Sequence, residues 1–330
     1  MKDDLWTWAD DAVDLTPEQH RWRARDVSYY RGPWTRLKAM IPGFELAPFR
    51  LAEDGPENQH LRMVVRQPVS RTEQPIPIGT VSPSYSLAPH GAVAELCYEG
   101  LVRCGVERDE VRPELGLSEL GEWMNLRLIL PERFSMKEGT GEETALRLEC
   151  FNSVDGSSRL VIVFGWLRFV CANGLIIGET MIEIRERHDG SLALDEIPKR
   201  IEAAFRKADE DRETRLGLQK LSVHDDALVK WVDGPVSKAW GKKAAARVLH
   251  ICRTGRDAEL DDPFAPGEAS EKPLRALSPV AGSAIPAESA FDVMQAMSFV
   301  ATGRRDAIEQ QKMLRELDRL LNVLQTREAA

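Results

Sequence analysis

Strings of β-forming residues occupy the middle of the chain. Runs at 123–131, 144–151 and 159–170 combine aliphatic and aromatic residues and are separated by turn-forming residues, a pattern that predicts β-strands. The third run is apolar on both faces, as in a strand that is covered on both sides, and 182–187 has the pattern of one more strand. We expect these strands to form a central antiparallel or mixed sheet.

Extended segments also precede this block. Residues 44–52 and 61–67 flank a polar turn at 53–58, as the two strands of a β-hairpin do. Residues 78–88 have the pattern of a short strand that enters a loop, and 91–104 carry apolar residues at helical spacing. These segments predict a hairpin, a further strand and a helix ahead of the central strands.

The C-terminal half of the chain has the apolar spacing of helices. Apolar residues recur at helical spacing at 197–228 and 236–252, and again at 287–301 and 305–325. Strands come before helices, which favours an α+β fold with a helical C-terminal half over alternating α/β. The apolar stripe of the last helix either docks on the core or forms a seam with a partner helix or a second copy. Its members are Ile308, Met313, Leu317, Leu320, Leu321 and Leu324.

Composition divides the chain into four parts. We expect an aromatic and basic N-terminal arm at 1–45, partly helical, and then an α+β core at 46–255 in which the sheet is followed by helices. A loop rich in Pro, Gly, Ser and Asp spans 256–286. A C-terminal helical hairpin at 287–330 then docks on the core.

The net charge of the chain bears on how it could bind nucleic acid. Acidic residues outnumber basic ones 53 to 44, giving a net charge of −9, which argues against a protein that coats nucleic acid through its overall field. Any nucleic-acid contact must therefore be local. The five cysteines form no C-x-x-C pair, and their odd count fits poorly with a disulfide framework, so we expect reduced thiols.

The sequence also lacks several well-known signals. Residues 1–15 are acidic where a signal peptide is basic, and no stretch approaches the roughly 18 apolar residues of a membrane span, so we expect a cytoplasmic protein without membrane contact. There is no phosphate-binding P-loop, dinucleotide fingerprint, nucleophile elbow or zinc-protease helix, and the six histidines lack the spacing of a zinc site. No feature requires a metal or cofactor.

Three polar segments near strand ends are candidates for chemistry. Residues 152–158 suit a tight turn, yet Asp155 is also a candidate metal ligand or catalytic carboxylate if a second acidic group lies nearby. Residues 168–175 end in an Asn-Gly turn, and Cys171 is either a buried structural thiol or a nucleophile that needs a base. Residues 185–190 either end a strand in a polar turn or bind phosphate or carboxylate.

The order of these motifs resembles that of the domain of unknown function 932 family, a prokaryotic family found mainly on phages, prophages and plasmids. The resemblance is carried by 78–85, 152–158, 168–175, 187–190 and 290–297, and would cover roughly 45–325. The motif positions singled out are Asn152, Asp155, Gly156, Arg168, Cys171, Asn173, Arg187 and His188. The resemblance implies an accessory protein of a mobile element, in DNA transactions or host–phage conflict, with no assigned reaction.

The first function that fits is a non-enzymatic nucleic-acid binder, with single-stranded DNA favoured. Interleaved aromatic and cationic side chains stack on bases while they neutralise phosphates. The candidates are Arg21, Trp22, Arg23, Arg25, Tyr29, Tyr30 and Arg31 in the arm, with a second basic stretch at Lys242, Lys243 and Arg247. The alternative for the arm is that its aromatic rings pack on the core while its arginines face water.

Two further functions remain open. A metal-dependent nuclease or other hydrolase would use Asp155, Glu183, Arg187 and His188 around the central sheet and would need Mg²⁺. An oligomeric protein-interaction module in phage–host conflict would use the C-terminal helices as its contact. The lack of catalytic signatures favours the non-enzymatic function.

Overall fold

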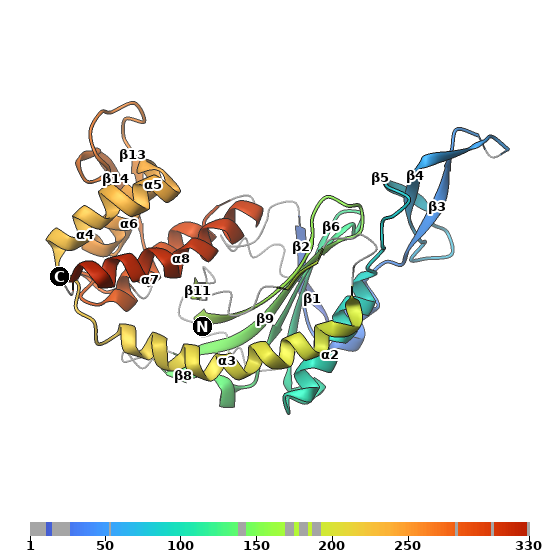
Figure 1. The fold of residues 1–330 in the computed structure, drawn as a ribbon, viewed down its shortest axis with the longest axis horizontal. Coiled ribbons are helices and arrows are strands. Elements are labelled where there is room, and N and C mark those ends of the chain that lie inside the picture. The colour runs from blue at the N-terminus through green and yellow to red at the C-terminus, as the bar shows by residue number, and fades with distance from the viewer. Residues whose placement is uncertain are drawn as a thin grey trace.

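A large antiparallel sheet forms the centre of the molecule (Figure 1). The computed structural model describes residues 11–14, 27–52, 54–137, 143–168, 175–177, 184–186, 193–280, 283–304 and 307–328. The strand order is β1-β2-β6-β7-β9-β10-β11, with β12 paired to β10 and β8 to β9. The strands are β1 Val13–Asp14, β2 Val27–Arg31, β6 Arg112–Ser118, β7 Trp123–Ile129, β8 Met136–Lys137, β9 Glu143–Ser153, β10 Leu160–Arg168, β11 Leu175–Ile177 and β12 Ile184–Glu186.

One face of this sheet carries the main apolar core. Strand residues such as Leu126, Leu148 and Phe164 are buried there together with residues of helix α2 (His90–Arg103) and helix α3 (Ile197–Leu218), and Figure 1 shows both helices lying along the sheet. The two helices cross closely at Gly100, where a Cβ atom would lie 2.7 Å from the Cβ of Ile201. The opposite face of the sheet carries the polar alternate residues described below.

The predicted β-hairpin projects from one end of the molecule (Figure 1). Strands β3 (Phe44–Arg50), β4 (Glu57–Arg66) and β5 (Ile76–Val81) form a separate antiparallel sheet of three strands. A small apolar cluster of Phe44, Val64, Val81 and Val154 joins it to the end of β9. The short helix α1 (Trp34–Lys38) lies between β2 and β3 in the chain.

The opposite end of the molecule is helical. The predicted helix over 197–228 is divided into α3 and α4, because the backbone between them leaves the helical path: Val223 N–H bonds to Glu288 O and Ala290 N–H to Leu221 O. A π-helical turn at Val232–Val236 links α4 to α5. The remaining elements are α4 Asp225–Trp231, α5 Ser237–Trp240, α6 Lys242–Thr254, β13 Arg256–Leu260, β14 Leu274–Pro279, α7 Ala290–Thr302 and α8 Ala307–Glu328.

The apolar stripe of the last helix packs inside the chain. Leu317, Leu320 and Leu324 of α8 are buried, and the indole Nε1 of the buried Trp231 donates a 2.8 Å hydrogen bond to the Leu320 carbonyl. The stripe therefore docks on α4 and its neighbours, which leaves its buried leucines inaccessible to a second copy. Among the described helices, none has the length and apolar character needed to cross a bilayer.

Three differences from the sequence-based expectations stand out. The antiparallel α+β fold is confirmed, but β2 lies where a partly helical arm is predicted, and β6 is a strand that the sequence pattern did not reveal. Within the predicted loop at 256–286, β13 and β14 form a two-stranded sheet whose second strand is largely exposed. An exposed strand such as β14 has little apolar alternation, and the sequence pattern therefore does not predict it.

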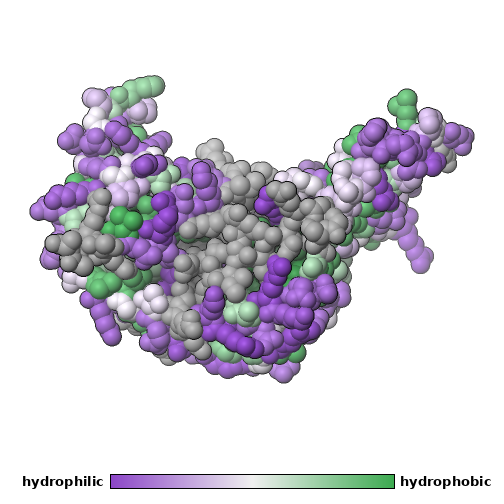
Figure 2. Space-filling view, in the orientation of Figure 1, coloured by the Kyte–Doolittle hydropathy of each residue, from purple (hydrophilic) through white to green (hydrophobic). Residues whose placement is uncertain are grey.

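Polar side chains cover most of the described surface in Figure 2, and apolar ones appear at the tips of two projections. Leu51, between β3 and β4, is 100% exposed, and Phe264, between β13 and β14, is 92% exposed. Single exposed apolar residues are normal on soluble proteins. Neither tip therefore identifies a binding surface.

Candidate functional site

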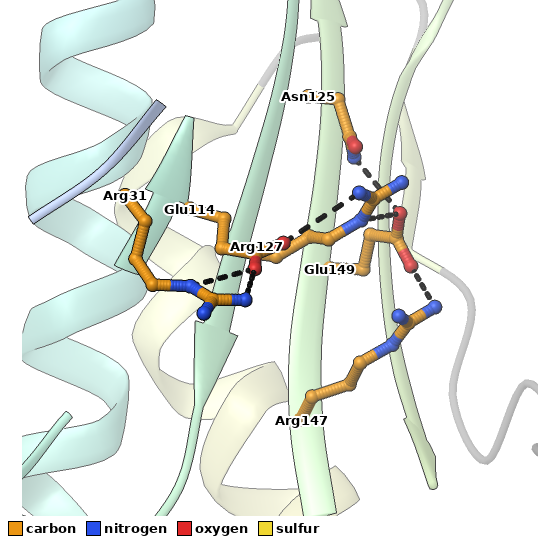
Figure 3. Close-up of polar contacts among 6 residues, drawn as sticks. All are labelled: Arg31, Glu114, Asn125, Arg127, Arg147 and Glu149. Atoms are coloured by element: carbon orange, nitrogen blue, oxygen red, sulfur yellow. Dashed lines mark hydrogen bonds and ion pairs between the residues drawn. The ribbon is translucent and has the colours of Figure 1, made fainter. Parts of the chain in front are cut away.

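A row of charged side chains crosses the polar face of the central sheet (Figure 3). Arg31 of β2 lies directly opposite Glu114 of β6, Glu114 opposite Arg127 of β7, and Arg127 opposite Glu149 of β9. Direct cross-strand partners share a face of the sheet, so the four side chains alternate in sign along one line. Arg147, two residues before Glu149 on the same face, ends the row.

Hydrogen bonds and ion pairs join the row from end to end. Arg31 Nε donates to Glu114 Oε1 over 3.0 Å, and its Nη2 donates to the same oxygen. Arg127 Nη1 lies 3.8 Å from Glu114 Oε2, while Arg127 Nε donates to Glu149 Oε1 over 2.8 Å. Glu149 also accepts from Asn125 Nδ2 over 3.0 Å and from Arg147 Nη2.

The row begins and ends with a cation. Among the residues of this row, Arg31, Arg127 and Arg147 pair with the carboxylates of Glu114 and Glu149, and all of these except Arg31 are buried. The Arg31 side chain is 30% exposed, so it forms the solvent-facing end of the row. A buried group of charges is costly, because desolvation is repaid only by full pairing.

Arg147 is the least satisfied member of the row. Its side chain is 2% exposed, yet its Nε and Nη1 atoms have no hydrogen-bond partner among the described residues. Its cross-strand neighbours are Ile129 and Gly165, whose side chains supply no acceptor. Burial lowers the pKa of Arg147 to about 10, although the Glu149 carboxylate opposes this shift.

Glu149 is the carboxylate that pairs with both Arg127 and Arg147. Burial by itself would raise the pKa of its carboxyl group, but the charges of Arg147 and Arg127 and the hydrogen bonds from Arg127 and Asn125 hold that pKa below its usual range. Glu149 is therefore the anion on which the inner half of the row depends.

The aromatic residues of β2 pack against the sheet. Tyr29 is only 2% exposed, and the Arg127 guanidinium lies over its ring at 5.1 Å from the centroid. The ring also fills the space opposite Gly116, where a Cβ atom would lie 2.6 Å from Tyr29 Cε1. Tyr30 packs against the main core. At these two positions the arrangement favours the alternative in which the arm's aromatic rings pack on the core.

The other predicted nucleic-acid residues are either outside the described residues or on a different element. Arg21, Trp22, Arg23 and Arg25 fall outside the described residues. Lys242, Lys243 and Arg247 belong to α6 in the helical end of the molecule, where Arg247 pairs with Asp257 at 2.9 Å and Lys242 lies 3.6 Å from Glu268. The structure brings Arg31 into the charged row, whereas Lys242, Lys243 and Arg247 lie on α6.

The turn at 152–158 joins the projecting sheet to the central one. Asp155 Oδ1 accepts from the backbone N–H and the hydroxyl of Ser157, and Gly156 adopts φ +83°, which favours glycine. Asn152 Nδ2 donates to the Ala88 carbonyl and contacts His90 Nδ1, both at 2.8 Å. These bonds support the turn as a structural element.

The hydrolase candidates are not brought together within the described residues. Glu183 and His188 lie outside them, as do Cys171, Asn173 and Arg187, and Arg168 ends β10 with its side chain outside the description. Across the part of the chain that the structure describes, no group of three or more His, Cys, Asp or Glu side chains is placed to hold a metal ion.

Sequence reasoning missed most of the charged row. Glu114, Asn125, Arg127, Arg147 and Glu149 were not singled out, although two signals were present. Asn125 and Arg127 alternate with apolar residues in one predicted strand, and Arg147 and Glu149 do so in another. Charges at alternate positions within strongly β-forming runs mark a polar sheet face.

A family model matches more than half of the chain. The family model described as "Domain of unknown function (DUF932)" matches residues 77–283, which includes β6, β7 and β9 with four members of the charged row. No curated protein and no solved structure matches the chain.

Proposed function

The chain belongs to the domain of unknown function 932 family, and from this premise we propose that it is a non-enzymatic nucleic-acid-binding protein that serves a phage, prophage or plasmid in the cytoplasm. Single-stranded DNA is the favoured ligand. The mobile-element setting rests on the resemblance of the motifs alone, whereas the binding function rests on the site.

The arginines of the charged row carry this proposal. A buried row that begins and ends with a cation is stabilised by an anion, and Arg31 offers a half-buried contact at its outer end. Arginine is well suited to phosphate because its planar fork forms two parallel hydrogen bonds. A phosphate-bearing ligand therefore fits the row better than a cation or an apolar molecule does.

The sequence next to the row favours nucleic acid among phosphate-bearing ligands. Strand β2, which carries Arg31, follows directly after the segment that contains Arg21, Trp22, Arg23 and Arg25. Aromatic and cationic residues in alternation stack on bases and neutralise phosphates. The net charge of −9 disfavours contacts elsewhere on the surface, which suits a short, local contact with a single strand.

Fluorescence anisotropy of labelled single-stranded DNA, titrated with protein over a range of salt concentrations, tests the proposal. We expect affinity to fall with salt, with a log–log slope of about −0.7 for each phosphate contacted. Replacing Trp22 and Arg23 by alanine together is expected to weaken binding by at least about tenfold, because one stacked base is worth about 1–3 kcal/mol.

The matched control is the double variant Phe264→Ala with Arg275→Ala. It removes one aromatic ring and one arginine from the exposed β13–β14 hairpin, and it is expected to bind as the wild type does. Failure of the folded wild-type protein to bind any strand at low salt would overturn the proposal. Cleavage that requires Mg²⁺ would instead support a nuclease.

A further inference from the structure

One face of the projecting sheet of β3, β4 and β5 packs against the rest of the chain. Val64 of β4 lies directly opposite Gly79 of β5, and such cross-strand partners share a face of the sheet. A Cβ atom at Gly79 would lie 3.1 Å from the Cβ of Asp155, and Val64 belongs to the same apolar cluster as Val154. The turn that follows β9 therefore covers this face.

The opposite face, which we call the outer face, is apolar as well. Met63 lies between Ala47 of β3 and Thr80 of β5, and Val65 lies opposite Pro77 of β5. Met63 and Ala47 are half-buried, and neither they nor Val65 belong to an apolar cluster of the described residues. A sheet that packs on one side alternates apolar with polar residues. Adjacent apolar residues on the second side indicate a second contact.

The edges of this sheet are less suited to association than its outer face. Both edge strands contain a proline, Pro48 in β3 and Pro77 in β5. Proline has no N–H to donate to an added strand, and proteins use it to protect sheet edges from pairing. We therefore expect a partner to cover the outer face rather than to extend the sheet.

The charges of β3 indicate what this partner is. Glu45, at the base of the strand, is exposed and lies opposite Val65 on the outer face. Arg50, at the other end of the strand, is 43% exposed and lies 3.8 Å from Glu57. The two residues are about 17 Å apart along the strand. A twofold axis through the middle of the outer face reverses the strand direction, so Arg50 meets the partner's Glu45 on each side of the apolar centre.

We propose that the outer face packs on the same face of a second copy of this chain, which gives a twofold-symmetric dimer. The two sheets stack about 10 Å apart with their strands within about 30° of each other. The sheet projects from one end of the molecule (Figure 1), so the rest of each chain lies away from the contact. This inference is independent of the proposed nucleic-acid function.

The size of the outer face sets the strength of the dimer. Three short strands bury less than the roughly 800 Å² per partner that is typical of stable interfaces. Charge pairs at the rim of an interface mainly fix its register and contribute little affinity. The dimer is therefore reversible, with a dissociation constant in the micromolar range.

Sedimentation equilibrium of the full-length protein over a series of concentrations tests the dimer. We expect the wild type to pass from monomer to dimer as its concentration rises. Met63→Glu places a carboxylate in the apolar centre and is expected to weaken association at least about tenfold. Glu45→Arg places like charges together and is expected to do the same. Glu45→Arg combined with Arg50→Glu restores opposite charges and is expected to recover most of the association.

The matched control for charge reversal is Arg275→Glu. Arg275 is an exposed arginine of the β13–β14 hairpin that pairs with Glu259 at 2.6 Å, and we expect its reversal to leave the dimer unchanged. A wild-type protein that stays monomeric up to about 100 µM, where a micromolar dimer is nearly complete, would overturn the proposal.

A dimer could also form through another surface. In that case Met63→Glu would leave it intact, or the double charge exchange would associate no better than Glu45→Arg alone, and either result would overturn the proposal. The wild-type series and the charge exchange decide the matter even if Met63→Glu fails to fold.

Discussion

Glu149→Gln is expected to lower the free energy of unfolding by about 3–5 kcal/mol, because it leaves Arg127 and Arg147 buried without their shared anion. Glutamine keeps the size of the side chain, so the loss reports the charge rather than a cavity. Urea unfolding followed by tryptophan fluorescence measures the difference.

The matched control is Glu99→Gln. Glu99 pairs with Arg103 four residues later on the exposed side of α2, and such pairs contribute about 0.3–0.5 kcal/mol. Equal stabilities of the two variants would contradict the assignment of Glu149 as the central anion of the row.

The stability of Glu149→Gln is also expected to depend on pH differently from that of the wild type. Because the pKa of Glu149 is lower in the folded protein than in the unfolded chain, its contribution to stability is present above the unfolded value of about 4.3 and is lost as the pH falls through the folded-state pKa. Glu149→Gln is therefore expected to lose less stability than the wild type on acidification below about pH 4.3.

Trp231→Ala is expected to lower the free energy of unfolding by about 3–5 kcal/mol, the usual cost of removing a fully buried aromatic side chain. The indole lies in the core between α4 and α8 and bonds to the Leu320 carbonyl. Trp231→Phe keeps much of the ring but leaves that carbonyl without the indole donor, so a smaller loss of about 1–3 kcal/mol is expected.

Leu221→Ala serves as the control because Leu221, in the segment between α3 and α4, is an exposed side chain. We expect its effect to lie within about 0.5 kcal/mol. If Trp231→Ala were as stable as Leu221→Ala, or if it changed the oligomeric state without a loss of stability, the docking of α8 on its own chain would be contradicted.

The elements with strong local patterns could be predicted from the sequence. The hairpin at 44–67, the strands that became β7, β9 and β10, and helix α2 all appear where alternation or helical spacing predicts them. In each case the apolar residues on one face are enough to specify the element. The family resemblance, carried by motifs at several of these strand ends, is also confirmed.

Strand β6 shows what local patterns cannot reveal. It contains Pro113 and Gly116, residues that disfavour strands. Gly116 is compatible with the sheet because the ring of Tyr29, on the neighbouring strand, fills the space that a side chain at position 116 would occupy. The glycine at position 116 is explained only by the pairing of β2 with β6, two strands that are far apart in the chain.

The charged row could not be predicted for the same reason. Arg31, Glu114 and Glu149 come from separate parts of the chain, and their alternation depends on the register of β2, β6, β7 and β9. Sequence reasoning selected Arg31 and Tyr29 as part of an exposed aromatic and basic patch. The structure keeps Arg31 partly exposed but buries Tyr29 beneath Arg127.

A buried row of this kind has two physical explanations. In the first, the row fixes the register of the strands, and every member then stabilises the fold. In the second, the row is a binding site for an anion, and its least satisfied member then lowers the stability of the protein while no anion is bound. Arg147 separates the two explanations, since Glu149 keeps Arg127 and Asn125 as partners when Arg147 is removed.

The most direct measurement is therefore the free energy of unfolding of Arg147→Met together with its affinity for single-stranded DNA. An anion site predicts stability equal to or greater than that of the wild type, because an incompletely paired buried charge is replaced by an apolar side chain, together with a loss of affinity for the strand. A loss of several kcal/mol with unchanged affinity would contradict the account and assign Arg147 to the framework of the sheet.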